Sequence, residues 1–162
     1  MSEVRAIYPG SFDPITRGHL DLIGRGSRLF GHLVVAVLTN FEKQPLFTVE
    51  ERVQMLRTVT KGMRNVSVDT FGGLLVVYAR RKRARAILRA IRAFADYEYE
   101  LQMALTNRGL EPKIETVFLT PAEAYSHISS RLVKEIFING GSVKGLVPPV
   151  VEERLRQKVF SK

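Results

Sequence analysis

The sequence contains no cysteine, and this absence excludes two kinds of architecture. Neither a disulfide framework nor a metal site with thiolate ligands is available to the chain. The N-terminus lacks the apolar run of a secretory signal. No apolar stretch approaches the length needed to cross a bilayer. We therefore expect a cytoplasmic protein with no membrane partner.

Internal repeats, low-complexity segments and interdomain linkers are also lacking, and 162 residues suffice for one domain with a proper core. The formal net charge of +9 favours an anionic partner, either nucleic acid or a phosphorylated small molecule. The densest basic run is Arg80-Arg81-Lys82-Arg83-Ala84-Arg85. Because no stacking aromatic side chains interrupt it, we interpret this run as a solvated helix end and expect no nucleic-acid partner.

Strand-like and helix-like patterns alternate along the chain. Residues 33–38 form a continuous apolar run, typical of a strand covered on both faces. Thr48 to Glu51 form a capping box from which a helix continues. The alternation predicts an α/β fold, a Rossmann-like doubly wound five-stranded parallel sheet with helices on both faces. Further strands are expected near 4–7, 65–71, 86–88 and 114–119, and further helices over 20–29, 74–83, 97–110, 129–138 and 149–159.

A loop rich in Gly, Ser, Asp and Pro connects the first strand to the first helix. Its sequence is Tyr8-Pro9-Gly10-Ser11-Phe12-Asp13-Pro14-Ile15-Thr16-Arg17-Gly18-His19. Free backbone N–H groups collect at such a helix start and favour anions. Gly18 permits close approach because it has no Cβ, and His19 follows in the first turn. The plain structural alternative is a tight turn in which His19 only caps or packs.

Thr16-Arg17-Gly18-His19 resembles the T/H-x-G-H signature of the nucleotidylyltransferase superfamily. The longer string over 8–19 resembles one family within it, the phosphopantetheine adenylyltransferases of bacterial coenzyme A synthesis. This resemblance extends over nearly the whole chain and is weakest after Gly140. It implies one nucleotidylyltransferase domain over residues 1–162. The implied reaction transfers AMP from ATP to 4′-phosphopantetheine, giving dephospho-coenzyme A and pyrophosphate.

A second matching segment begins at the end of the fourth predicted strand. Arg89 and Arg92 could pair with the carboxylates that follow them or clamp phosphates, and the residues alone favour neither. The family string R-G-x-R-x-x-x-D-F/Y-E-x-E matches residues 89–100 and supports phosphate clamping. One position departs from that string, because Ala90 stands where the family has glycine.

Two further segments match. Residues 128–135 resemble the family's I-S-S-x-x-V/A-K-E segment, whose helix N-terminus receives ATP phosphates, although Ser129 alone would read as an ordinary N-cap. Arg131 stands where some relatives have serine. Residues 43–52 resemble K-x-P-x-F-x-x-E-E-R, which makes Lys43 a candidate phosphate contact. Leu75 occupies a position that relatives use to contact the pantetheine arm.

The resemblance implies these roles. His19 is the expected transition-state stabiliser. Mg²⁺ is the expected cofactor, held by substrate phosphates and water rather than by protein ligands. A homohexamer and feedback inhibition by coenzyme A are further expectations. Acceptor binding is expected at Ser11, Lys43, Leu75 and Arg89. ATP binding is expected at Ser11, Phe12, His19, Ala90, Ile91, Arg92, Glu100, Tyr125, Ser126, His127, Ile128, Ser129, Ser130 and Arg131.

Two other functions stay open from the sequence. A sister adenylyl- or cytidylyltransferase would use the same nucleotide machinery with another phosphorylated acceptor. A nucleic-acid-binding module would exploit the positive charge, and its affinity would fall steeply with salt.

Overall fold

A computed structural model describes residues 3–39 and 44–160 of the chain. Its five strands form one parallel sheet in the order β3-β2-β1-β4-β5. The chain order reverses beside β1, which pairs with β2 on one side and β4 on the other. This topology confirms the predicted Rossmann-like fold. The strands are β1 Arg5–Gly10, β2 His32–Leu38, β3 Val66–Phe71, β4 Ala86–Ala90 and β5 Glu115–Leu119.

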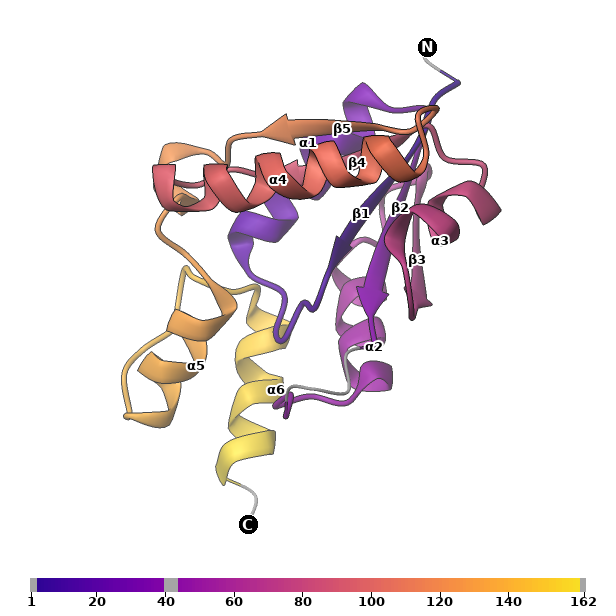
Figure 1. Cartoon of the computed structure of the whole chain (residues 1–162). Helices are drawn as coiled ribbons and strands as arrows, with labels where there is room; N and C mark the ends of the chain where they lie inside the picture. The colour runs from indigo at the N-terminus through magenta and orange to yellow at the C-terminus, as the bar shows by residue number, and fades with distance from the viewer. Residues whose placement is uncertain (1–2, 40–43, 161–162) are drawn as a thin grey trace.

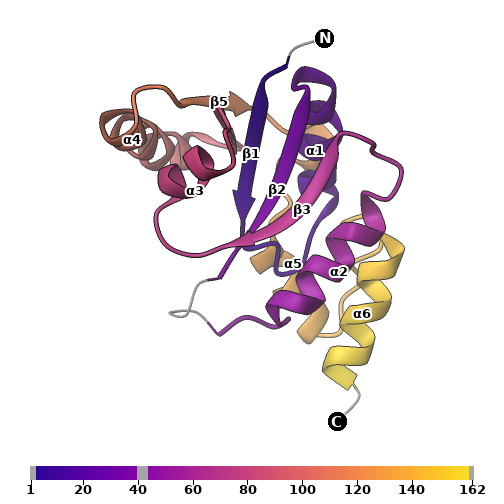
Figure 2. The same ribbon diagram turned by 90° about the vertical axis from the view of Figure 1, so that its right-hand side faces the viewer.

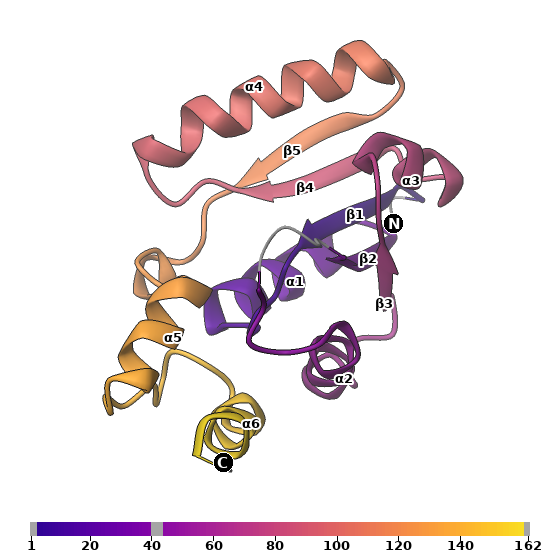
Figure 3. The ribbon, with the colours of Figure 1, turned by 60° about the horizontal axis from the view of Figure 1, so that its bottom comes forward.

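Helices cover both faces of this sheet. The helices are α1 Arg17–Leu29, α2 Val49–Val59, α3 Leu75–Arg81, α4 Phe94–Leu110, α5 Ser130–Ile138 and α6 Pro149–Phe160. Figure 3 shows α3 and α4 on one side of the sheet and α1 and α2 on the other. Successive strand residues point to opposite faces. In β1, Ala6 and Tyr8 therefore join the core beneath α1 and α2, whereas Ile7 joins the core beneath α3.

The last third of the chain returns to the carboxyl end of the sheet. A short 3₁₀ helix, η1 (Glu123–Tyr125), follows β5 and leads into α5. Figure 1 shows α5 and α6 beyond the carboxyl ends of β1 and β2. Figure 2 shows α6 alongside α2, where Lys158 Nζ lies 2.8 Å from Glu51 Oε2. Segments from both ends of the sequence thus enclose one edge of the sheet.

Helix α4 departs from the amphipathic packing that its sequence suggests. It begins at Phe94, three residues before the predicted start, and its two buried residues are the polar Glu100 and Asn107. Glu100 turns inward because it pairs with Arg89 on β4. The helix instead exposes large apolar side chains: Phe94, Tyr97, Tyr99, Met103, Leu105 and Leu110.

The basic run closes α3, as the sequence predicts, and lies at the amino edge of the sheet because β4 begins just after it. The Arg81 guanidinium lies 5.7 Å from the centroid of the Tyr78 ring, and Lys82 pairs with Asp69. The run is therefore remote from the carboxyl edge, where ligands bind in such folds. Within the described part of the chain, no helix combines the length and the apolar content that a bilayer crossing demands.

Candidate active site

Two adjoining cavities open at the carboxyl edge of the sheet. The first has a volume of about 250 Å³ and lies between the β1–α1 loop, the end of β4 and η1. The second, of about 480 Å³, is more apolar and lies between the ends of β1 to β3 and the helix α4. Pro9, Gly10, Arg89 and Glu100 line both cavities. We call them the nucleotide cavity and the arm cavity, after the substrate parts that the family resemblance leads us to expect in each.

His19 is held in the nucleotide cavity by the start of α1. Thr16 is the N-cap residue, and its hydroxyl accepts a hydrogen bond from the His19 N–H at 3.3 Å. The Thr16 N–H in turn donates to His19 Nδ1 at 3.0 Å. This reciprocal pair is a capping box in which histidine takes the place of the usual Glu or Gln. Because Nδ1 accepts a hydrogen bond from the Thr16 N–H, the hydrogen of the neutral imidazole ring is on Nε2.

The pKa of His19 is lowered to about 4. Burial of the ring is the larger cause, and the positive charge of Arg92 adds to it. In the ligand-free protein at neutral pH, His19 is therefore an uncharged imidazole with one N–H donor. Such a donor can stabilise an oxygen atom that gains charge during a reaction.

The His19 ring is packed by the aromatic side chain of Phe12. The two ring centroids are 5.1 Å apart at an interplanar angle of 68°, and Phe12 meets Tyr8 edge-on at 5.4 Å. Phe12 has a positive φ of 49°, which turns its side chain back under the loop. Gly10 makes this possible, because a Cβ there would lie 3.0 Å from the Phe12 ring. The loop therefore fixes both the hydrogen bond and the packing of His19.

Gly18 lies against the backbone of η1. A Cβ at Gly18 would lie 3.4 Å from the Tyr125 carbonyl oxygen. The first turn of α1 thus packs against η1, which brings the two halves of the fold together at the cavity. A Cβ at this distance would make an ordinary van der Waals contact, so the Tyr125 backbone does not require glycine at this position.

Arg89 and Glu100 form a two-bond ion pair in the wall between the cavities. Arg89 Nε donates to Glu100 Oε2 at 2.8 Å, and Arg89 Nη2 donates to Oε1 at 2.5 Å. Burial alone would lower the pKa of Arg89, but the hydrogen bonds and charge of Glu100 raise it. One of the two explanations left open by the sequence, a carboxylate partner, is thus present. The guanidinium still lines both cavities and keeps its charge there.

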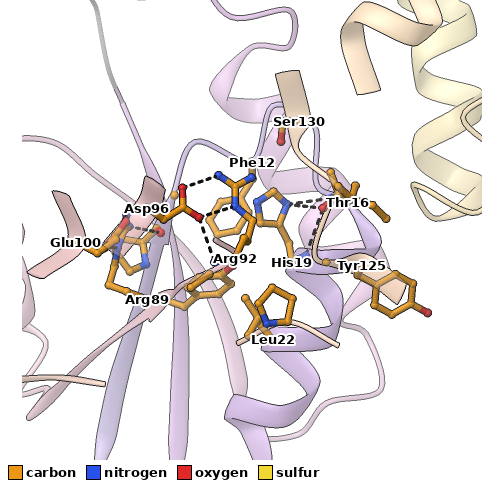
Figure 4. A pocket seen from close by; sticks show the side chains of 17 residues that line it. Phe12, Thr16, His19, Leu22, Arg89, Arg92, Asp96, Glu100, Tyr125 and Ser130 are labelled. Atoms are coloured by element: carbon orange, nitrogen blue, oxygen red, sulfur yellow. Dashed lines mark hydrogen bonds and ion pairs between the residues drawn. The ribbon is translucent and has the colours of Figure 1, made fainter. Parts of the chain in front are cut away.

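Arg92 lines the nucleotide cavity together with His19 and also has a carboxylate partner (Figure 4). Its Nε atom and its backbone N–H both lie 3.1 Å from Asp96 Oδ2. Burial would raise the pKa of Asp96, but these bonds outweigh it and lower that pKa. The Arg92 side chain remains 40% exposed, so it can reach a ligand.

The N-terminus of α5 forms another wall of the nucleotide cavity. Ser129 is its N-cap, and its hydroxyl accepts the Leu132 N–H at 3.1 Å. The Ser130 hydroxyl donates to the Pro14 carbonyl at 2.7 Å, which ties α5 to the β1–α1 loop. The ordinary capping role expected for Ser129 is therefore present, and the helix start still presents backbone N–H groups to this edge.

The structure brings most of the predicted nucleotide-binding residues together. The nucleotide cavity is lined by Phe12, His19, Ala90, Arg92, Glu100, Tyr125, Ile128 and Ser130. Of the predicted acceptor-binding residues, Ser11, Leu75 and Arg89 line the arm cavity. Lys43 lies outside the described residues. Five predicted residues line neither cavity: Ile91, Ser126, His127, Ser129 and Arg131. Of these, His127 and Arg131 are exposed.

Two buried charged residues support the site and were given no role by the sequence. Asp13 accepts the Leu46 and Phe47 N–H groups at 2.9 and 2.8 Å and pairs with Lys134 at 3.0 Å. Arg52 is 4% exposed and donates to the Ser11 carbonyl at 2.8 Å. A signal for Arg52 exists, since it lies three residues after Val49 and four before Leu56, on the apolar face of α2.

Comparison with known proteins agrees with this geometry. The model of the cytidylyltransferase-like family matches residues 7–136. A phosphopantetheine adenylyltransferase from Thermodesulfovibrio yellowstonii is 56% identical over 94% of this chain and 95% of its own length. One from Cyanothece sp. is 59% identical over 88% of this chain and 85% of its own. This chain belongs to the phosphopantetheine adenylyltransferase family.

A solved structure with low sequence identity agrees with this chain in its fold. It comes from Vibrio parahaemolyticus and is provisionally named a nicotinate-nucleotide adenylyltransferase. The TM-score is 0.74, with 100% of this chain and 97% of that one covered, at 14% sequence identity. Nucleotidyltransferase architecture is therefore retained where little of the sequence is shared.

Proposed function

We propose that this chain transfers the AMP group of ATP to 4′-phosphopantetheine, releasing dephospho-coenzyme A and pyrophosphate. The observation that carries this proposal is the shared wall at Arg89 between a polar and an apolar cavity. A nucleotide fits the cavity that holds His19, and the pantetheine arm fits the cavity that contains Leu75. The acceptor phosphate would then lie near Arg89, beside the α-phosphorus of ATP. The names of the close relatives support the same assignment.

The chemistry is a direct in-line displacement. An oxygen of the acceptor phosphate forms a bond to the α-phosphorus, the bond from that phosphorus to the bridging oxygen breaks, and pyrophosphate leaves with the electron pair. The attacking phosphate is already ionised at neutral pH, so no strong general base is required. Catalysis then comes from alignment and charge stabilisation.

The side chains at the two cavities suit these tasks. His19 Nε2–H donates to an α-phosphate oxygen as it gains charge. Arg89 and Ser11 hold the acceptor phosphate, with Lys43 as a predicted third contact. Arg92 and the N-terminus of α5, with Ser129 and Ser130, hold the β- and γ-phosphates.

Mg²⁺ is proposed to enter with the triphosphate. The two carboxylates that line the nucleotide cavity, Asp96 and Glu100, are both bonded to arginines. In residues 3–39 and 44–160, no three His, Cys, Asp or Glu side chains form a metal-binding group. The pairing of both carboxylates with arginines supports a metal held by phosphates and water, where it would neutralise charge on the departing pyrophosphate.

Further proposals concern assembly and regulation. The exposed apolar side chains of α4 support self-association, and we propose the homohexamer implied by the family resemblance. Coenzyme A carries the same pantetheine arm as the acceptor, so we propose that it competes for the arm cavity. A cytoplasmic location is supported by the use of ATP as a substrate.

Pyrophosphate release on incubation with ATP and 4′-phosphopantetheine tests the function. We expect release with this acceptor and markedly less with a panel of other phosphorylated acceptors, and less with CTP than with ATP. A sister transferase would show the highest rate with another acceptor or with CTP. Replacing Arg80 and Arg81 by serine should leave the rate unchanged, because both lie at the opposite edge of the sheet.

A further inference from the structure

Arg52 is a buried cation beneath the β1–α1 loop. Its Nη1 atom donates to the Ser11 carbonyl at 2.8 Å and approaches the Leu38 carbonyl at 3.4 Å. Its Nε atom donates to the Thr48 carbonyl at 3.2 Å. One side chain therefore joins the loop after β1, the end of β2 and the start of α2.

The charge of Arg52 is balanced by dipoles rather than by a carboxylate. Among the described residues it forms no ion pair, and the nearby Asp13 is occupied by Lys134 and two backbone N–H groups. Burying a cation that is bonded only to carbonyl groups costs more free energy than burying one that is paired with a carboxylate. This cost calls for a compensating role of Arg52 in function.

The peptide bond held by Arg52 is the one between Ser11 and Phe12. In the described chain the cis peptide is Asp13-Pro14, so this bond is trans. In a planar trans peptide the C=O and N–H bonds point in opposite directions. Because Arg52 holds the carbonyl on the side of α2, the Phe12 N–H is directed away from α2. That N–H makes no hydrogen bond to any residue that the structure describes.

We propose that Arg52 is a positioning residue that aims the Phe12 N–H at a phosphate oxygen of the bound substrate. This proposal rests on the proposed transfer reaction. Arg52 fixes the peptide plane, and its charge polarises the carbonyl and so strengthens the opposite N–H as a donor. Phe12 lines the nucleotide cavity and packs on His19, so the same peptide also sets the position of the imidazole.

The first test replaces Arg52 by lysine in the full-length chain. Lysine keeps the charge but cannot hold the Ser11 and Thr48 carbonyls together, because it lacks the planar fork. We expect kcat for pyrophosphate release to fall about 10- to 100-fold, the effect of a misaligned donor. KM for ATP should rise by a smaller factor than kcat falls, since the alignment of the donor matters most in the transition state. The matched control is Arg57→Lys, an exposed arginine on the same helix, which should keep the wild-type kcat.

A second variant removes the donor and keeps the Arg52 side chain. An amide-to-ester exchange at Phe12, made by incorporating phenyllactate, deletes this N–H and also weakens the Ser11 carbonyl as an acceptor for Arg52. Its kcat should fall by a similar factor. Adding Arg52→Lys to the ester variant should then lower kcat little further, because both changes remove the same interaction. If the two losses multiply, or if the ester variant keeps the wild-type kcat, the proposal is wrong.

A third measurement is independent of the reaction. Ser11-Phe12 is the one Ser-Phe pair in the sequence, so carbonyl-¹³C serine combined with ¹⁵N phenylalanine selects this amide in an NMR spectrum. Titration with inorganic pyrophosphate should move its proton signal downfield in the wild type and in Arg57→Lys, and clearly less in Arg52→Lys. An equal shift in all three proteins would overturn the proposal. If the wild-type protein released no pyrophosphate with 4′-phosphopantetheine, the proposed function would be wrong. The NMR comparison of the three proteins would still test the role of Arg52.

Discussion

Replacement of His19 by alanine separates catalysis from folding at this site. The substitution removes the Nε2–H donor that faces the nucleotide cavity. Loss of one preorganised donor to a developing oxyanion lowers turnover by roughly 10²–10³-fold, or about 3–4 kcal/mol of barrier. We therefore expect kcat for pyrophosphate release to fall by that factor.

The same substitution has a smaller effect on stability. It removes the hydrogen bond from Thr16 N–H to Nδ1 and the contact with the Phe12 ring. A capping bond contributes about 1 kcal/mol and an aromatic pair about the same. A loss of about 2 kcal/mol should lower Tm by roughly 4–8 °C in a chain of this size. The variant should therefore remain folded at 25 °C while it is nearly inactive.

His19→Gln supplies the matched control. Glutamine can accept the Thr16 N–H in an ordinary capping box, so most of the lost Tm should return. Turnover should stay at least about tenfold below wild type, because the amide lacks the ring that packs on Phe12. Thermal unfolding and initial-rate assays measure both quantities. The role of His19 would be structural if the glutamine variant recovered turnover together with Tm. The same would hold if the unfolded fraction of the alanine variant accounted for its whole loss of turnover.

Three further predictions follow from the charges and the backbone at the site. The pKa of His19 is about 4 in the folded protein and near 6.5 when unfolded, so unfolding takes up a proton at low pH. The free energy of unfolding should therefore lose about 3 kcal/mol as pH falls from 6.5 to 4, an effect that urea titrations should find absent in His19→Gln. Glu100→Gln leaves Arg89 half-buried without a carboxylate and should cost about 1–3 kcal/mol of unfolding free energy. The double variant Arg89→Met with Glu100→Leu should regain stability but show a raised KM for the acceptor, and an unchanged KM would remove Arg89 from the acceptor site. Ala90→Gly should tighten ATP binding in calorimetry or leave it unchanged, and clear weakening would show that the methyl group is favourable.

Local patterns were sufficient to predict the fold. Continuous apolar runs such as residues 33–38 are typical of strands covered on both faces, and their alternation with helical patterns predicts the parallel sheet. The capping box at Thr48 and the Ser129 N-cap are found where the sequence placed them. These features depend on residues three or four positions apart, which is why they are visible without a structure.

The pairing of charged side chains could not be predicted in the same way. The sequence offered three carboxylates for Arg89 and Arg92, and the structure gives Glu100 to the first and Asp96 to the second. The choice depends on how α4 lies against β4, and no local pattern contains that information. The orientation of α4 depends on the same packing, since Glu100 occupies its inward face and large apolar side chains are exposed.

The sequence by itself determined the alternation of strands and helices, the loop that carries His19 and the family to which the chain belongs. These rest on hydrophobic period, capping and contiguous motifs, all of which are local. The tertiary structure alone decided the low pKa of His19, the wall that Arg89 and Glu100 form between two cavities, and the anchoring of the Ser11 carbonyl by Arg52, which lies 41 positions away in sequence. Burial and long-range hydrogen bonding set these properties, and they exist only once distant segments pack together.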